Sequence, residues 1–232
     1  MQILDQLAPF SLLDALAVCA LLAGWIGIGW RIEHPADRRV STSKLVARYR
    51  REWMVQMVTR QPRIFDGSIL STLRQGASFF ASATMIGIGG GLALLGNTDR
   101  LSGVAADLAQ AEAPALVWEV RILLVIGLLA HAFLSFVWSH RLFGYCAVVM
   151  ASVPNDPEDP RAFPRAAQAA EVNITAARSF NRGLRSVYFA MAALAWFAGP
   201  MGLIAATLIT LFVLWRREFA SRSRAVLLED KV

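Results

Sequence analysis

The sequence predicts an all-α, polytopic membrane protein with four transmembrane helices in one membrane domain, residues 1–232. Composition is the first observation, since 56% of the residues are hydrophobic and the mean hydropathy is +0.48, whereas soluble domains are usually about 45–50% apolar. The second is that the apolar residues gather in blocks with few charges. The third is block length, because a helix crosses the hydrocarbon layer in about 20 residues. The predicted spans are about 12–30, 76–96, 118–140 and 187–215.

Loop charge predicts the orientation of these spans. The segment 31–75 holds ten basic and four acidic residues, whereas 97–117 holds one basic and three acidic residues. By the positive-inside rule, 31–75 is cytoplasmic, 97–117 and the N-terminus lie outside, and 141–186 is again cytoplasmic. The first block has no basic n-region, so we expect it to remain as a span. Arginine outnumbers lysine 21 to 2, as in GC-rich bacterial genomes, which favours a bacterial inner membrane.

The C-terminal tail, RREFASRSRAVLLEDKV, conflicts with four single crossings, because they would place its five basic residues outside. One interpretation is that AWFAGPMG (195–202) divides the fourth block into a re-entrant hairpin, which returns the tail to the cytoplasm. The other is one helix kinked at Gly199 and Pro200. We favour the kinked helix, because each half of a hairpin would have only about 12–15 residues. The side of the tail stays open.

The first cytoplasmic loop is predicted to contain an amphipathic helix. An N-cap is available at 41–43, and an apolar residue then recurs every four positions at Leu45, Tyr49, Trp53 and Met57. Such a helix can lie on an anionic leaflet or pack beneath the helix bundle.

A second helix is predicted before the fourth span, within RAAQAAEVNITAARSFNRGLRSVYF. Its polar residues approach the membrane entry and are candidate contacts for anions or lipids: Arg178, Asn181, Arg182 and Arg185. They fit lipid headgroup contact, or an anion or partner site, since arginine binds phosphate and carboxylate bidentately.

Small residues at four-residue spacing favour close helix packing in the first two spans. Examples are Ala20 with Gly24 and Gly87 with Gly91. The run GIGGG (87–91) lacks the Lys-Ser/Thr and the strand–helix context of a phosphate loop. We therefore expect packing, within the bundle or between protomers.

Several stretches carry a family resemblance: REWMVQM, SFFASATMIG, FVWSHRLFGYCAVVMASVP and SFNRGLRSVYFAMAALAWFAGP. Together they resemble the domain of unknown function 599, a family of membrane proteins in bacteria and plants. The resemblance covers most of the chain and implies a multi-pass membrane protein. It implies no reaction and transfers no catalytic residue.

His131 lies near the middle of the third span, where a polar group is a functional candidate. His140 is nine residues away, roughly half a turn out of phase at about 100° per residue, so the two cannot share a metal or haem. We expect an interhelical hydrogen bond from His131. The alternative is a polar path along His131, Ser135 and Trp138.

A second group of candidate functional residues lies near the outer ends of the spans. It comprises Asp14, Glu119 and Arg121, which could form an intramembrane ion pair.

The sequence carries no recognised enzyme or metal motif. The motifs GxSxG, HExxH and Walker A are absent, and Cys19 and Cys146 lack CxxC spacing. We therefore predict no enzyme activity, catalytic residue, metal or cofactor. Nothing resembles a nucleic-acid-binding module, so the net charge of +6 favours contact with anionic lipid.

These observations favour a structural or accessory subunit, either a homo-oligomer or part of a larger membrane complex. The alternative is a small channel or transporter that uses the Gly199–Pro200 break and the His131 stripe. A membrane enzyme or redox protein has the least support.

Overall fold

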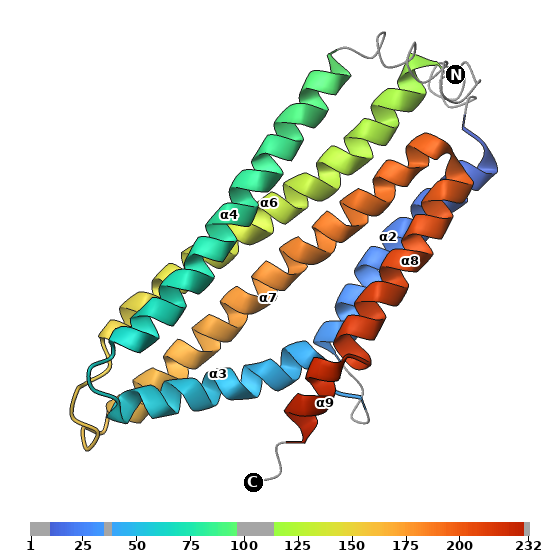
Figure 1. Ribbon diagram of the computed structural model, residues 1–232. Helices are drawn as coiled ribbons and strands as arrows, with labels where there is room; N and C mark the ends of the chain where they lie inside the picture. Colours follow the sequence, from blue (N-terminus) through green and yellow to red (C-terminus); the bar gives the residue numbers. More distant parts are fainter. Residues whose placement is uncertain (1–9, 35–38, 97–113, 230–232) are drawn as a thin grey trace. The chain divides into compact units, whose positions relative to one another are not determined.

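The computed structural model describes residues 10–34, 39–96 and 114–229, and all regular structure within them is helical (Figure 1). The helices are α2 (Leu12–Glu33), α3 (Thr42–Thr59), α4 (Ile64–Leu95), α6 (Ala115–Ala151), α7 (Ala162–Leu194), the 3-10 helix η1 (Ala195–Ala198), α8 (Pro200–Phe219) and α9 (Arg222–Leu228). The all-α prediction is confirmed. Most of the predicted outer segment 97–117 lies outside the described residues.

Three of the described helices, α2, α4 and α6, are long and apolar enough to cross a membrane. The membrane class is therefore supported, whereas the predicted count of four spans is not matched by a fourth such helix in this part of the chain. α4 and α6 also extend well beyond the predicted spans, with 32 and 37 residues. Hydropathy detects only the part of a helix that suits hydrocarbon, and a helix need not end where polar residues begin.

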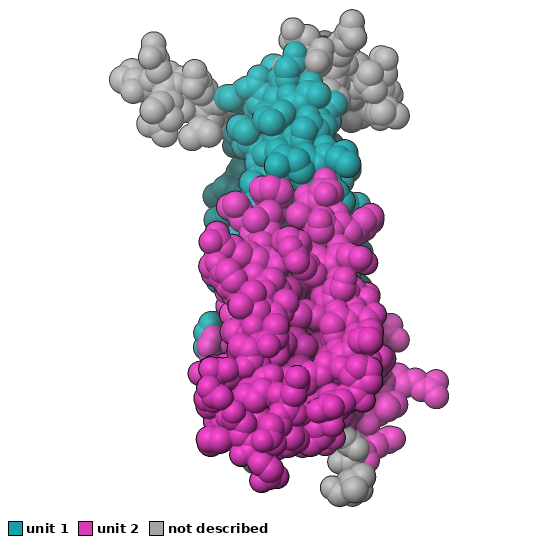
Figure 2. All heavy atoms as spheres, turned by 90° about the vertical axis from the view of Figure 1, so that its left-hand side faces the viewer, with its two compact units in different colours: residues 1–30, 83–132, 184–215 teal, residues 31–82, 133–183, 216–232 magenta. Residues whose placement is uncertain are grey.

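The chain forms two compact units, coloured separately in Figure 2. The first unit comprises residues 1–30, 83–132 and 184–215. Its core joins α2, α6, α7 and α8 through buried side chains that include Leu21, Leu128, Phe189, Trp196 and Leu203. On its α4 segment, a Cβ at Gly87 would contact Leu129 and one at Gly91 would meet Ile126. This glycine pair therefore packs within the bundle.

The second unit comprises residues 31–82, 133–183 and 216–232. Its core holds Met54 and Met57 of α3 together with Leu70, Phe143 and Cys146. The amphipathic helix is present as α3, with Ser41 as its N-cap. Because its apolar face packs into this core, α3 is docked on its own unit.

Residues 187–215 do not form the single kinked helix that the sequence favoured. α7 ends at Leu194, and Gly199 has a φ of 98°, a left-handed value that ends helical geometry and suits glycine. Pro200 then begins α8, where its missing N–H costs no hydrogen bond. α7 passes from the second unit into the first, and α8 passes back into the second at residue 216. The segment is a helical hairpin, visible in Figure 1 as α7 and α8.

Candidate functional site

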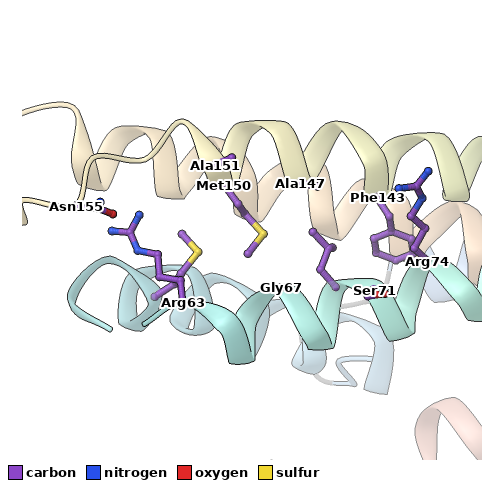
Figure 3. Close-up of a pocket in the computed structure, with 11 residues that line it drawn as sticks. Arg63, Gly67, Ser71, Arg74, Phe143, Ala147, Met150, Ala151 and Asn155 are labelled. Carbon is purple, nitrogen blue, oxygen red and sulfur yellow. The ribbon is translucent and has the colours of Figure 1, made fainter. Parts of the chain in front are cut away.

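A cavity of about 440 Å³ lies in the second unit, between the first turns of α4 and the last turns of α6 (Figure 3). Most of its lining is apolar or small, with two arginines and two polar side chains added. The lining residues are Met57, Arg63, Gly67, Leu70, Ser71, Arg74, Phe143, Ala147, Met150, Ala151 and Asn155. Its size is that of a small-molecule pocket.

The two arginines play different roles. Arg63 donates to the carbonyl oxygens of Val153 at 2.8 Å and Pro154 at 2.7 Å, so it ties the loop after α6 to the start of α4. Its Nε is buried without a partner among the described residues. Arg74 is exposed and donates from Nε to Nε2 of His140 at 3.0 Å. This contact joins α4 to α6.

A buried carboxylate anchors the start of α4 beside the cavity. Asp66 is fully buried, accepts a hydrogen bond from Nε1 of Trp53 at 2.7 Å and pairs with Arg60. A buried charge is tolerated only when it is paired and hydrogen-bonded. Asp66 therefore joins α3 to α4, and it does not line the cavity.

Asn173 occupies the interior of the same unit. It accepts a hydrogen bond from Arg50, and its amide lies 3.6 Å from Sγ of Cys146. Burial lowers the pKa of the Arg50 guanidinium from its ordinary value. Since arginine titrates so high, Arg50 remains a cation and acts as a structural donor.

In the first unit, His131 makes an interhelical hydrogen bond. Its Nδ1 lies 2.8 Å from Oγ of Ser186 on α7. Nε1 of Trp25 on α2 donates to the same oxygen at 3.2 Å, and the Trp25 and His131 rings meet edge to face at 4.9 Å. Ser186 is fully buried. One serine hydroxyl thus joins α2, α6 and α7.

The rest of the predicted His131 stripe belongs to the second unit. Ser135 is half-buried, and the Trp138 side chain is 49% exposed. His140 contacts Arg74, so the two histidines have separate partners. Among the described residues, no group of three or more His, Cys, Asp or Glu side chains could hold a metal ion.

Asp14 contributes to the first unit from the first turn of α2. It accepts hydrogen bonds from Oγ of Ser11 at 2.6 Å and from Nε1 of Trp196 at 2.7 Å. The Arg121 guanidinium lies over the rings of Trp118 and Trp196, at 5.1 and 5.6 Å from their centroids. The Asp14 and Arg121 charges attract each other, but no ion pair within 4 Å joins them among the described ion pairs.

Glu119, the third residue of that predicted group, is half-buried on α6. Asp14 accepts from the indole N–H of Trp196, Arg121 lies over its ring, and no ion pair among the described residues joins Asp14, Glu119 and Arg121.

The predicted anion-binding residues are divided between the units. Arg185, in the first, is buried beside Gly29. In the second, Asn181 donates to Oγ of Ser43 at 3.4 Å, and Arg182 donates to Glu33 at 2.9 Å, which raises the Arg182 pKa. Arg178 is exposed. Asn181 and Arg182 therefore make contacts within the protein.

Sequence reasoning missed Arg63, Arg74, Asp66 and Ser186. Arg63 and Arg74 were counted only as loop charge, although Arg63 immediately precedes α4 and Arg74 lies on it, two residues before the predicted span 76–96. The cavity is lined by residues of α4 and of α6, which are far apart in the chain, so no local spacing identifies it. Ser186 lies in the helix before the fourth block and carries no motif.

Comparison with known proteins identifies the family of the chain. A family model described as a protein of unknown function, DUF599, matches residues 16–223. The chain belongs to this family. The match confirms the resemblance seen in the sequence and includes the cavity of this DUF599 member together with its α7–α8 hairpin. No curated protein and no solved structure matches the chain.

Proposed function

We propose that this DUF599 member is a structural or accessory subunit in a membrane, which associates through the exposed side of α4. The observation that carries the proposal is the outer half of α4, residues 83–95. Only 11% of the apolar window of α4 is buried in the chain. An apolar surface of this extent is covered in nature by lipid or by another protein.

The exposed side of α4 is distinct from the side that packs in the bundle. Gly87 and Gly91 face α6, whereas a Cβ at Gly89 or Gly90 would meet nothing within 4 Å. Beside these open glycines, Ile86 is 76% exposed. Small residues let the backbones of two membrane helices approach closely and gain dispersion contacts. This supports helix association at Gly89 and Gly90, with a second copy or with another membrane protein.

The proposal is tested by isolating the full chain in a mild detergent and measuring the mass of the assembly and what accompanies it. Gly90→Ile should dissociate the assembly, because a branched side chain prevents close approach. Gly27→Ile is the matched control, since Gly27 on α2 also has open space at its Cβ. A wild-type chain that is monomeric and alone, or a Gly90→Ile assembly of unchanged mass, would refute the proposal.

A small channel or transporter is the second candidate, favoured by two features. The α7–α8 hairpin has a backbone break at Gly199, and Ser186, His131 and Trp25 form a polar cluster in the same unit. Broken helices often line solute sites in transporters. Solute or ion flux into liposomes containing the chain, lost in Ser186→Ala, would favour this candidate over the accessory role.

We also propose an orientation, with the N-terminus outside and residues 31–75, 141–186 and the C-terminal tail in the cytoplasm of a bacterial inner membrane. The tail and residues 31–75 belong to one unit, and Glu218 accepts hydrogen bonds from Ser43. The basic charge of both segments then obeys the positive-inside rule. A reporter fused after residue 232 should give a cytoplasmic signal, and a periplasmic signal would contradict this orientation.

A further inference from the structure

We propose that the cavity between α4 and α6 binds a small aromatic carboxylate from the cytoplasm, with the carboxylate at Arg74 and the ring against the apolar lining. All lining residues belong to the segments 31–75 and 141–186, which a water-soluble ligand reaches without entering the bilayer. The site goes beyond the accessory role and is separate from the α4 surface, residues 83–95, proposed for association. It can therefore exist whether or not the chain is an accessory subunit.

The charge of the lining selects an anion. Two of its residues, Arg63 and Arg74, are cations, none is acidic, and no described ion pair includes either arginine. A cation without a carboxylate partner attracts an anionic group, and the attraction is stronger beside a surface that excludes water. The cavity therefore favours an anion over a neutral molecule of the same shape.

Arg74 is the arginine that can hold the anion. The amino groups of Arg63 donate to three backbone carbonyls, which fix this side chain at one end of the cavity. Arg74 is exposed, and its described hydrogen bond uses Nε, toward His140. Its amino groups have no described partner, and such a pair of donors binds a carboxylate as a fork. Ser71 is one turn earlier on α4 and adds a hydroxyl at the same end of the cavity (Figure 3).

The rest of the lining selects an aromatic group. The floor of the cavity consists of four buried apolar side chains, Met57, Leu70, Phe143 and Met150. Methionine adapts its shape to a neighbour and its sulfur contacts aromatic rings favourably, and Phe143 can pair with a second ring. A small hydrophilic anion leaves this surface without contacts, whereas an aromatic ring covers it.

The opening and the volume of the cavity suit one such molecule. Gly67, Ser71 and Ala151 are exposed along the cavity, and their small side chains leave the floor open. A Cβ at Gly67 would meet nothing within 4 Å. The volume of about 440 Å³ lies in the range of pockets that hold drug-sized ligands. The cavity thus admits a two-ring carboxylate with its charge at the Arg74 end.

The test uses the full chain in phosphatidylcholine nanodiscs and equilibrium dialysis against 2-naphthoate, with empty nanodiscs as the blank. The matched neutral probe is 2-naphthamide, which has the same ring and shape without the charge. We expect 2-naphthoate to bind about tenfold more tightly than the amide, the effect of one charge-assisted contact. Equal binding of the two probes, or no binding of 2-naphthoate above the blank, would overturn the proposal. Its displacement by an equal concentration of acetate would also overturn it, since the apolar floor would then contribute nothing.

Two variants locate the site, and a third controls for surface charge. Arg74→Gln should remove most of the preference for 2-naphthoate over the amide. Gly67→Leu should weaken the binding of both probes several-fold, because the new side chain fills part of the cavity while both arginines remain. Arg48→Gln should bind both probes as the wild type does, because Arg48 is exposed on α3 in the same unit and does not line the cavity. Unchanged binding in Arg74→Gln or in Gly67→Leu would overturn the proposal, whatever assembly mass is measured for the α4 surface.

Discussion

The two units of the chain are stabilised in different ways. The second is joined by charged pairs that link segments distant in the sequence, such as Arg51 with Glu171 and Arg182 with Glu33. The first depends on close helix packing, with a few hydrogen bonds that converge on Ser186 and Asp14. Basic loops of a membrane protein are often regarded as solvated connections. Here they fold into a structured unit with its own core and a cavity.

The largest expected effect comes from removing the buried charge of the second unit. Asp66→Ala should lower the free energy of unfolding by about 3 kcal/mol, because it leaves Trp53 and Arg60 without their acceptor. Chemical denaturation of the detergent-solubilised chain measures this loss. Arg51→Ala is the control, since Arg51 and Glu171 form an exposed pair and its loss should cost less than about 1 kcal/mol. Equal losses would mean that Asp66 is not a special anchor.

A smaller effect is expected at the polar centre of the first unit. Ser186→Ala should cost about 1–2 kcal/mol, since it removes the oxygen that Trp25 and His131 share. The comparison is Ser139→Ala in the second unit, where the hydroxyl donates only to the Ala176 carbonyl at 2.8 Å. That variant should cost about half as much, in the same denaturation experiment. A larger loss of stability in Ser139→Ala than in Ser186→Ala would show that the first unit does not depend on its polar cluster.

A still smaller difference in stability between the units is expected when a packed glycine in each is replaced by alanine. A Cβ at Gly183 would lie 2.7–2.9 Å from three atoms of the buried Phe136 ring, so Gly183→Ala should destabilise the second unit by about 1 kcal/mol. A Cβ at Gly87 in the first unit would lie 3.2 Å from Cδ1 of Leu129, the far end of a flexible side chain. Gly87→Ala should therefore be nearly neutral, because the gain in helix propensity offsets the crowding. Thermal unfolding of both variants checks the difference.

The smallest effect concerns pH. Hydrogen bonds from Arg161 lower the pKa of Asp159 to about 2, from an ordinary value of 3.8. The ionised form is therefore favoured in the folded chain, so its contribution is complete above pH 3.8 and is lost as the pH falls through about 2. Asp159→Asn should flatten this part of the stability profile and slightly lower the stability near neutral pH, where the contribution of the ionised carboxylate is complete. Unfolding measured between pH 2 and 6 tests the prediction, and an altered profile only above pH 5 would contradict it.

The sequence predicted what depends on periodicity and hydropathy. Helix α3 follows from an apolar residue at every fourth position, and α2, α4 and α6 follow from their apolar length. The sequence located the break between α7 and α8 correctly at Gly199 and Pro200, but it favoured a kinked helix, whereas the structure has a turn between two helices. A Gly-Pro pair fits a kink or a turn equally well, and only the φ of Gly199 and the packing of Leu203 decide between them.

The candidate site was less predictable, because its parts meet only after folding. Arg74 and His140 are 66 residues apart in the chain. His131 was recognised as a group that needs a partner, but its partner Ser186 lies 55 residues away on a helix that was expected mainly to contact lipid headgroups. The sequence shows which polar side chains need a hydrogen-bond partner within a membrane. It does not reveal which helix brings the partner.

The contact between Ser43 and Glu218 sets an order on biosynthesis. These residues are 175 positions apart, so the ribosome has already released α3 from its exit tunnel long before Glu218 is made. Helix α3 must wait during that interval without the carboxylate that accepts its N-terminal N–H group. The second unit is therefore completed only after translation has passed α8, and a chain stalled before residue 218 would present an unfinished second unit to quality-control proteases.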